Sequence, residues 1–245
     1  MTHQPDAPMP RHDEPCVEEV LRCGQIQVLG RIANSSNATF LVEMTHGDVQ
    51  HMAVYKPEEG ERPLWDFDPG LYRREVAAYL VSETLGWHIV PTTIIREDGP
   101  LGIGSVQVFI DHDPAEHFFT LFGQRPETHP QLRRLALFDL VVNNADRKSG
   151  HVLYDPDQRL WGIDHGLCFA APLKLRTVIW DFAGEPIDEE LLEELAPLAE
   201  DVPADVAAQL TQQEVAALQD RVAQLLISRR YPDDLTGRRF PWPLV

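Results

Sequence analysis

Residues 143–166, NNADRKSGHVLYDPDQRLWGIDHG, are the stretch that decides the fold we expect for this chain. The apolar residues 132–142 before it predict a helix that ends where the polar residues begin. Asp155-Pro156-Asp157 is typical of the turn in a hairpin between two short strands. Two carboxylates, those of Asp146 and Asp164, therefore flank one predicted hairpin.

The polar residues on both sides of this hairpin favour phosphoryl-transfer chemistry. Such a site needs a carboxylate that orients a hydroxyl, a cation that counters the moving charge, and ligands for a divalent metal. Asp146, Lys148 and Asp164 supply these groups in that order. Five positions after the catalytic Asp, protein kinases carry a metal-binding Asn, and His151 stands at that place here. Taken separately, the loop that contains Asp146 is also typical of a solvated turn, and the segment that contains Asp164 is also typical of a strand end.

A lysine and a glutamate upstream fit the same chemistry. Residues 51–56 predict a strand that breaks at Pro57 and ends on Lys56. The apolar pattern of residues 71–85 predicts an amphipathic helix with Glu75 at its inner edge. A strand lysine paired to a helix glutamate holds the nucleotide phosphates in protein kinases. We therefore expect an ion pair between Lys56 and Glu75, although a lysine at a strand end is also commonly solvated.

Two further segments are candidates for nucleotide contacts. Ser35, Ser36 and Asn37 lie between predicted strands at 24–30 and 38–44, where they form either a plain hairpin turn or a phosphate-covering loop. Downstream, strands are predicted at 89–95 and 105–110, separated by a turn at 97–100. In the second of these, the backbone of Gln107, Val108 and Phe109 is placed to bind an adenine edge, or belongs to a buried strand without a ligand.

The composition narrows the class of protein. The chain has 245 residues, 43% hydrophobic and 24% charged, which is ordinary for a globular protein. Its net charge of −18 argues against a nucleic-acid partner and against stable binding to anionic membranes. No run of about 18 apolar residues and no signal-like segment occurs. Three cysteines form no CxxC pair. We therefore expect a cytoplasmic protein with reduced thiols.

The last third of the chain predicts the surroundings of the site. Residues 167–186 read as a loop with aromatic anchors and are the natural place for an acceptor substrate. Helices are predicted at 188–199 and 213–227, the second begun by a capping box from Thr211 to Glu214. Residues 231–245 are interpreted as a packed arm.

With these residues laid out, the chain resembles the phosphatidylinositol 3-/4-kinase superfamily, most closely its type II phosphatidylinositol 4-kinase branch. The resemblance is carried, in this order, by RIANSSNATFLV, AVYKPEEGERP, REVAAYL, NNADRKSGHVLYD and WGIDHGLCFAAPLKL. It implies an α+β, two-lobed protein-kinase-like fold, with a small β-rich N-lobe at residues 16–110 and a mainly helical C-lobe at 111–245. A disordered arm is expected at residues 1–15, which contain four prolines.

The resemblance also implies an ATP-dependent kinase that uses Mg²⁺ or Mn²⁺. Lys56 would then bind the phosphates with Glu75 as its partner, Asp146 would be the catalytic aspartate, and Asp164 the chief metal ligand. Ser35, Ser36 and Asn37 match the phosphate-covering turn.

Two departures from the family pattern shape these expectations. His151 replaces the usual Asn, and an imidazole suits Mn²⁺ better than Mg²⁺. If His151 binds the metal, affinity should fall as the pH drops through about 6.5. The acidic chain also lacks a basic amphipathic helix and a cysteine cluster for lipidation. We therefore expect a protein or small-molecule hydroxyl as acceptor rather than a phosphoinositide. The alternatives are a nucleotide-binding pseudokinase that regulates without transfer and an inert structural protein.

Overall fold

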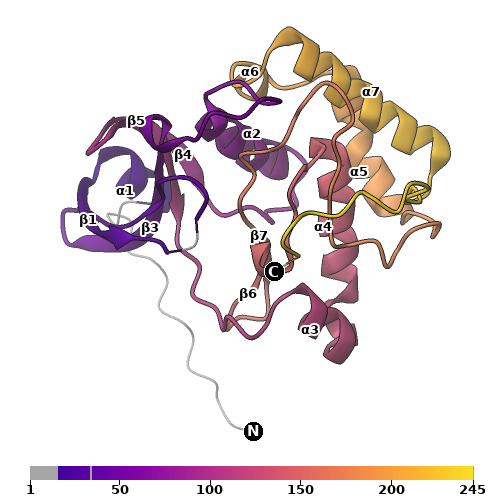
Figure 1. The fold of residues 1–245 in the computed structure, drawn as a ribbon, viewed down its shortest axis with the longest axis horizontal. Helices are drawn as coiled ribbons and strands as arrows, with labels where there is room; N and C mark the ends of the chain where they lie inside the picture. Colours follow the sequence, from indigo (N-terminus) through magenta and orange to yellow (C-terminus); the bar gives the residue numbers. More distant parts are fainter. Residues whose placement is uncertain (1–15, 34, 245) are drawn as a thin grey trace, which may run out of the picture.

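The computed structural model describes residues 16–33 and 35–244, so the arm expected at residues 1–15 lies outside the described residues. An antiparallel sheet forms the first lobe, with strand order β1-β2-β3-β5-β4. Its strands are β1 (Gln25–Arg31), β2 (Phe40–His46), β3 (Val49–Pro57), β4 (Thr93–Gly99) and β5 (Gly102–Val108). The short helix α1 (Val17–Cys23) buries Val20 and Leu21 in the core of this lobe (Figure 1).

The strand expected at 89–95 begins later than the sequence suggested. Ile89 and Val90 precede β4 and belong to the apolar core of the helical lobe. Their amides donate to the Ser82 Oγ at 2.9 and 3.3 Å, which replaces the hydrogen bonds of a strand. The strand also continues through Gly99, so that the chain reverses after it rather than at 97–100.

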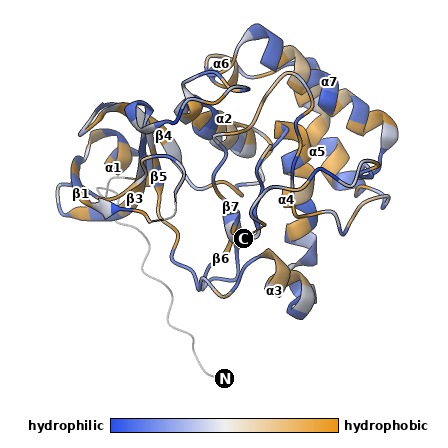
Figure 2. Ribbon diagram, in the orientation of Figure 1, coloured by the Kyte–Doolittle hydropathy of each residue, from blue (hydrophilic) through white to orange (hydrophobic). Residues whose placement is uncertain are grey.

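The second lobe is mainly helical. Its elements are η2 (Pro126–Thr128), η3 (Ser149–His151), the hairpin β6 (Val152–Tyr154) and β7 (Leu160–Gly162), and the helices α3 (Phe118–Gln124), α4 (His129–Val142), α5 (Glu189–Glu200), α6 (Ala204–Ala207) and α7 (Gln212–Ser228). Figure 2 shows hydrophobic residues concentrated in α4 and α5 at the centre of this lobe. The capping box expected at the start of α7 is present, since Thr211 accepts from the Glu214 amide and Glu214 from the Thr211 amide.

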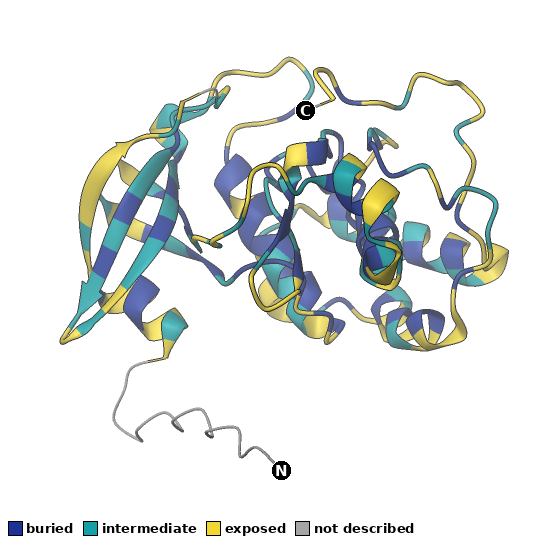
Figure 3. Ribbon diagram, turned by 90° about the horizontal axis from the view of Figure 1, so that it is seen from below, coloured by how far each residue is buried: buried dark blue, intermediate teal, exposed yellow. Residues whose placement is uncertain are grey.

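The helix α2 (Leu71–Thr84) joins the two lobes. The 3-10 turn η1 (Glu58–Gly60) and a loop lead from β3 into it. Ala77, Ala78 and Val81 of α2 pack in the large core of the helical lobe, whereas the sheet has a separate, smaller core. Figure 3 shows the same division, with buried residues gathered in the helical lobe and an exposed strand at the outer edge of the sheet.

The two-lobed α+β architecture expected from the sequence is confirmed. The lobe boundary expected at residue 110 divides the chain by sequence position. It does not match the packing, because α2 lies before residue 110 and packs in the core of the helical lobe. Among the helices that the structure describes, none is both long and apolar enough to cross a bilayer.

Candidate active site

Lys56 connects the two lobes through carboxylates. It lies near the end of β3. Its Nζ donates to the Oε1 of Glu75 on α2 and, at 2.9 Å, to the Oδ1 of Asp164, which follows β7 in the sequence. The Glu75 side chain is 3% exposed, the Lys56 side chain 22% and the Asp164 side chain 47%. The expected ion pair between Lys56 and Glu75 is therefore present, and it extends to the predicted metal ligand.

The backbone around Asp164 is held in an uncommon conformation. Asp164 has φ +62°, in the left-handed region that Asp adopts more easily than bulky residues. The next amide, that of His165, donates to the Oε2 of Glu75 at 2.9 Å. Glu75 thus binds Lys56 with one oxygen and the chain after Asp164 with the other. The Lys56 ammonium holds the pKa of Asp164 far below its usual range, so this carboxylate is ionised.

Asp146 and Lys148 lie together in the loop between α4 and β6. The Lys148 Nζ is 3.3 Å from the Asp146 Oδ2, and both side chains are about a quarter exposed. Burial raises the pKa of Asp146, and the Lys148 ammonium opposes that rise. The Asp146 amide donates to the Asn144 Oδ1 at 3.0 Å, which fixes the start of the loop. This arrangement suits a carboxylate that receives a proton from a hydroxyl.

Arg147, between these two residues, points inward and organises the loop. Its side chain is fully buried and forms a two-pronged ion pair with Asp139 of α4, at 3.0 Å from Nε and 2.9 Å from Nη2. It also donates to the carbonyls of His151 and Ile163 and, at 2.7 Å, to the His165 Nε2. A single guanidinium therefore ties α4, the loop and the strand before Asp164 into one unit.

The sequence alone assigned no role to Arg147 or to Asp139. The available signal was an aspartate inside the apolar stretch LALFDLVV of α4. A carboxylate on the buried side of a helix requires a buried cation nearby, and the next cation along the chain is Arg147.

His151 lies beside Asp164, the residue predicted to be the chief metal ligand. Its Nε2 is 3.3 Å from the Asp164 Oδ2, and its Nδ1 lies 3.4 Å from the Lys148 amide. Burial lowers the pKa of His151 to about 4. The imidazole is therefore neutral at ordinary pH, as a metal ligand must be. The sequence predicted that metal affinity would fall through a pH of about 6.5, and this value is wrong because burial lowers the pKa of His151.

The donor set fits a metal that is shared with a nucleotide. Asp164 and His151 offer an oxygen and a nitrogen that converge at 3.3 Å. Within the described residues, however, no group of three or more His, Cys, Asp or Glu side chains could hold a metal by itself. Divalent ions in phosphotransferases are commonly held by one or two carboxylates together with substrate phosphates. The two residues therefore suit that role and not a closed protein site.

The serine-rich turn is anchored to the loop that follows β3. The Ser35 Oγ is 2.8 Å from the Thr39 Oγ1, and the Asn37 Oδ1 accepts from the Arg62 amide at 3.0 Å. Ser36 is exposed between them. These contacts place the turn beside the chain that leads from Lys56 to α2. Its contact with phosphates remains a prediction.

The backbone expected to bind adenine is largely occupied. The Val108 amide donates to the Thr92 carbonyl at 3.0 Å, and the Phe109 amide donates to the Met52 carbonyl at 2.9 Å. The Gln107 side chain is buried and donates to the Thr93 Oγ1. Neither Val108, the last residue of β5, nor Phe109, the residue after it, therefore presents a free amide to a nucleotide.

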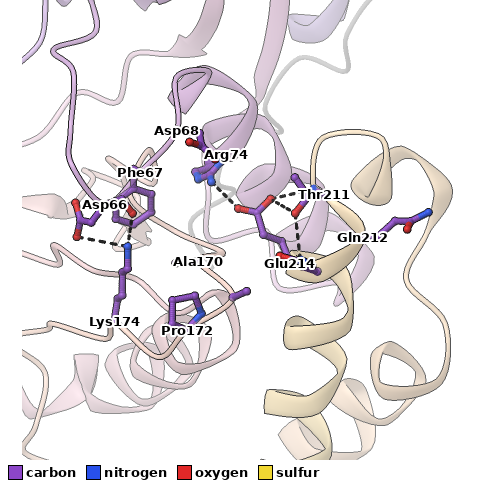
Figure 4. A pocket seen from close by; sticks show the side chains of 12 residues that line it. Asp66, Phe67, Asp68, Arg74, Ala170, Pro172, Lys174, Thr211, Gln212 and Glu214 are labelled. Carbon is purple, nitrogen blue, oxygen red and sulfur yellow. Dashed lines mark hydrogen bonds and ion pairs between the residues drawn. The ribbon is translucent and has the colours of Figure 1, made fainter.

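A separate cavity of about 500 Å³ lies beside α2 (Figure 4). Arg74 of α2 forms an ion pair with Glu214 at the start of α7, and Lys174 pairs with Asp66 across the opposite wall. None of the predicted catalytic, metal or nucleotide residues lines this cavity. It is therefore distinct from the site around Lys56.

Comparisons with known proteins place the chain among relatives of two kinds. No protein-family model matches it. Protein Rv2133c of Mycobacterium tuberculosis is 42% identical over 261 residues, which cover 91% of this chain and 94% of that protein. Phosphatidylinositol 4-kinase gamma 4 of Oryza sativa subsp. japonica is 26% identical over 194 residues, which cover 63% of this chain. The match spans only 34% of the rice protein.

Solved structures of kinase-like proteins share the fold. Hydra Fam20, solved with sugar, superposes with a TM-score of 0.57 at 11% identity and covers 86% of this chain and 87% of its own. The Helicobacter pylori proinflammatory kinase CtkA superposes with a TM-score of 0.50 at 11% identity, covering 86% and 94%. The expected kinase-like fold is therefore confirmed, whereas the type II phosphatidylinositol 4-kinase branch remains a prediction.

Proposed function

The chain belongs to the family of Mycobacterium tuberculosis Protein Rv2133c, and from the geometry of its site we propose that it is an ATP- and divalent-metal-dependent phosphotransferase. It transfers the γ-phosphoryl group to the hydroxyl of a protein or a small molecule. The observation that carries this proposal is the contact of Lys56 with both Glu75 and Asp164. The kinase-like fold and the likeness to a rice phosphatidylinositol 4-kinase support it.

The residues around Lys56 bind the nucleotide in this proposal. Lys56, oriented by Glu75, neutralises phosphate oxygens. Asp164 and His151 would hold the divalent ion, which would screen the charge of the phosphates. The Asp164 carboxylate also accepts a hydrogen bond from Lys56 at 2.9 Å, so it would be shared between the lysine and the ion.

Asp146 and Lys148 act on the acceptor. The Asp146 carboxylate accepts the hydroxyl proton, for which burial makes it a better base than an exposed aspartate. The Lys148 ammonium, 3.3 Å from it, counters the negative charge that develops on the transferred group. A phosphoinositide acceptor is disfavoured by the net charge of −18, which repels anionic headgroups.

A regulatory pseudokinase is the second candidate. His151 replaces the side-chain amide of Asn at the second metal position, and the described residues add no third His, Cys, Asp or Glu to complete a metal site. Such a protein would bind nucleotide with little or no transfer.

Calorimetric titration with ATP, with and without Mn²⁺ or Mg²⁺, followed by measurement of phosphate release and autophosphorylation, separates the two functions. A phosphotransferase binds ATP more tightly with metal and turns it over. Binding without turnover selects the pseudokinase, and no binding of any nucleotide excludes both.

A further inference from the structure

Residues 238–244, near the C-terminus, lie against the loop between α4 and β6 that carries Asp146 and Lys148. We call this loop the catalytic loop. The Ser149 amide, next to Lys148, donates to the Leu244 carbonyl at 2.8 Å. The Thr177 amide and the Trp180 Nε1 both donate to the Arg239 carbonyl at 3.1 Å. Figure 1 shows this segment, in yellow, crossing the helical lobe and ending beside the β6–β7 hairpin. We call residues 238–244 the strap.

The strap is the outer member of a layered arrangement that begins at Arg147, the residue after Asp146. The Arg147 amide donates to the Arg176 carbonyl at 3.0 Å, and the Val178 amide donates to the Arg147 carbonyl at 3.1 Å. The intervening Thr177 amide is the one that reaches the strap. The strap therefore contacts both the catalytic loop and the segment paired with it, on which we expected the acceptor to lie.

The strap is held by main-chain carbonyls and by apolar packing. The ring of Phe240 meets that of Trp180 edge to face at 6.4 Å, and Pro241 is buried. The Trp242 side chain, in contrast, is 88% exposed. Main-chain hydrogen bonds combined with a few side-chain anchors are the usual means by which a protein binds an extended peptide.

The sequence of the strap contains no phosphate acceptor. Residues 237–245, GRRFPWPLV, include no Ser, Thr or Tyr, and Thr236 is the last hydroxyl in the chain. A segment of this kind can lie at a transfer site without being modified.

We propose that the strap occupies the seat of an extended polypeptide acceptor and competes with it. This inference rests on the proposed phosphotransferase function and narrows its acceptor class from any hydroxyl compound to a polypeptide chain. The acceptor displaces the strap, takes its hydrogen bonds from Ser149 and Thr177, and presents a hydroxyl to Asp146.

Placing a hydroxyl in the strap tests the proposal. Trp242→Ser and Leu244→Ser each replace an exposed side chain, so the core is preserved. With ATP and Mn²⁺ or Mg²⁺, mass spectrometry should find phosphate on the new hydroxyl of at least one variant. In that step the hydroxyl oxygen bonds to the γ-phosphorus, the bond from this phosphorus to ADP breaks, and the hydroxyl proton passes to Asp146.

Two controls give the result its meaning. Leu235→Ser introduces a hydroxyl at a position that is 92% exposed and precedes the strap, and it should stay unmodified. Adding Asp146→Asn to either strap variant should abolish the modification. If the variants hydrolyse ATP yet carry no phosphate at 242 or 244, the strap proposal is overturned while the phosphotransferase function stands. If the wild type neither binds nor consumes ATP, the proposed function fails, and the strap proposal fails with it.

Competition is measured separately with Phe240→Gly, which removes the contact with Trp180. Hydrogen exchange at the Ser149 and Thr177 amides should become faster. A synthetic peptide of residues 236–244 carrying Leu244→Ser should be phosphorylated faster by this variant than by the wild type. Faster exchange with an unchanged rate on the peptide would contradict competition and leave the strap a packing arm.

Discussion

At the scale of single residues, Asp164 lies between two basic side chains, those of Lys56 and His151. Its Oδ1 lies 2.9 Å from the Lys56 Nζ and its Oδ2 lies 3.3 Å from the His151 Nε2, while the side chain is 47% exposed. This carboxylate is ionised and paired with Lys56, and its exposed side is accessible. It can therefore bind a metal without a rearrangement of the site.

We predict that Asp164→Asn weakens ATP binding in the presence of metal by at least about 10-fold and changes metal-free binding much less. The substitution removes the charge that holds the cation, while Asn tolerates the positive φ. Calorimetric titrations with and without Mn²⁺ measure both affinities. Asp157→Asn, in the exposed hairpin turn, is the matched control. Equal losses with and without metal would remove Asp164 from the metal site.

A second residue prediction concerns the pH dependence of transfer. Asp146 must be ionised to accept a proton, and burial raises its pKa, so the rate should fall on acidification at a higher pH than an exposed aspartate would give. Lys148 lowers that pKa. Lys148→Ala should therefore reduce the rate and move the acidic limb of the rate–pH profile further upward. Arg22→Ala, which removes an exposed cation from α1, should leave the acidic limb of the rate–pH profile in place. An unmoved limb in Lys148→Ala would contradict the role of Asp146 as base.

Some of these residues could be predicted from sequence and others could not. The sequence predicted a shared site for Lys56, Glu75, Asp146 and Asp164 from residue types at characteristic spacings, and the structure brings their side chains into one region. Their roles remain predictions. The amides of Val108 and Phe109 are occupied by the carbonyls of Thr92 and Met52, which lie 16 and 57 positions earlier in the chain, so their occupation has no local signal.

At the scale of elements, α4 and the loop that follows it are joined by one buried ion pair. Arg147 is fully buried and Asp139 is 1% exposed. The longer helices α2, α4, α5 and α7 were predictable because their apolar periodicity extends over three or more turns, whereas the shorter α1 and α6 were not predicted. The start of β4 was not, because a single hydroxyl, that of Ser82, binds the two amides before it. Short apolar runs carry no sign of which core they will join.

We predict that Asp139→Ala destabilises the fold by about 3–5 kcal/mol, because it leaves the Arg147 guanidinium buried without a counter-charge. Chemical denaturation followed by circular dichroism measures the change in the free energy of unfolding. Glu18→Ala breaks the exposed pair with Arg22 and should cost less than about 1 kcal/mol. Similar losses for the two variants would show that the Arg147 pair does not hold the loop.

At the scale of the whole molecule, the site is assembled at the border of two cores. Lys56 comes from the sheet, Asp146 and Asp164 come from the helical lobe, and Glu75 comes from α2, which packs with the helical core. Lys56 alone among these four is carried by the sheet. A ligand that bridges Lys56 and Asp164 therefore fixes one lobe against the other, which is how a nucleotide would organise the site for transfer.

The central claim, metal-dependent transfer of the γ-phosphoryl group, is tested most directly by following γ-labelled ATP with the purified full chain in the presence and absence of Mn²⁺ or Mg²⁺. We predict label appearing in phosphate or in phosphorylated protein only when metal is present. Asp146→Asn should reduce the rate by at least about 100-fold while preserving ATP binding. ATP bound but returned intact, or turnover that Asp146→Asn leaves unchanged, would contradict the account.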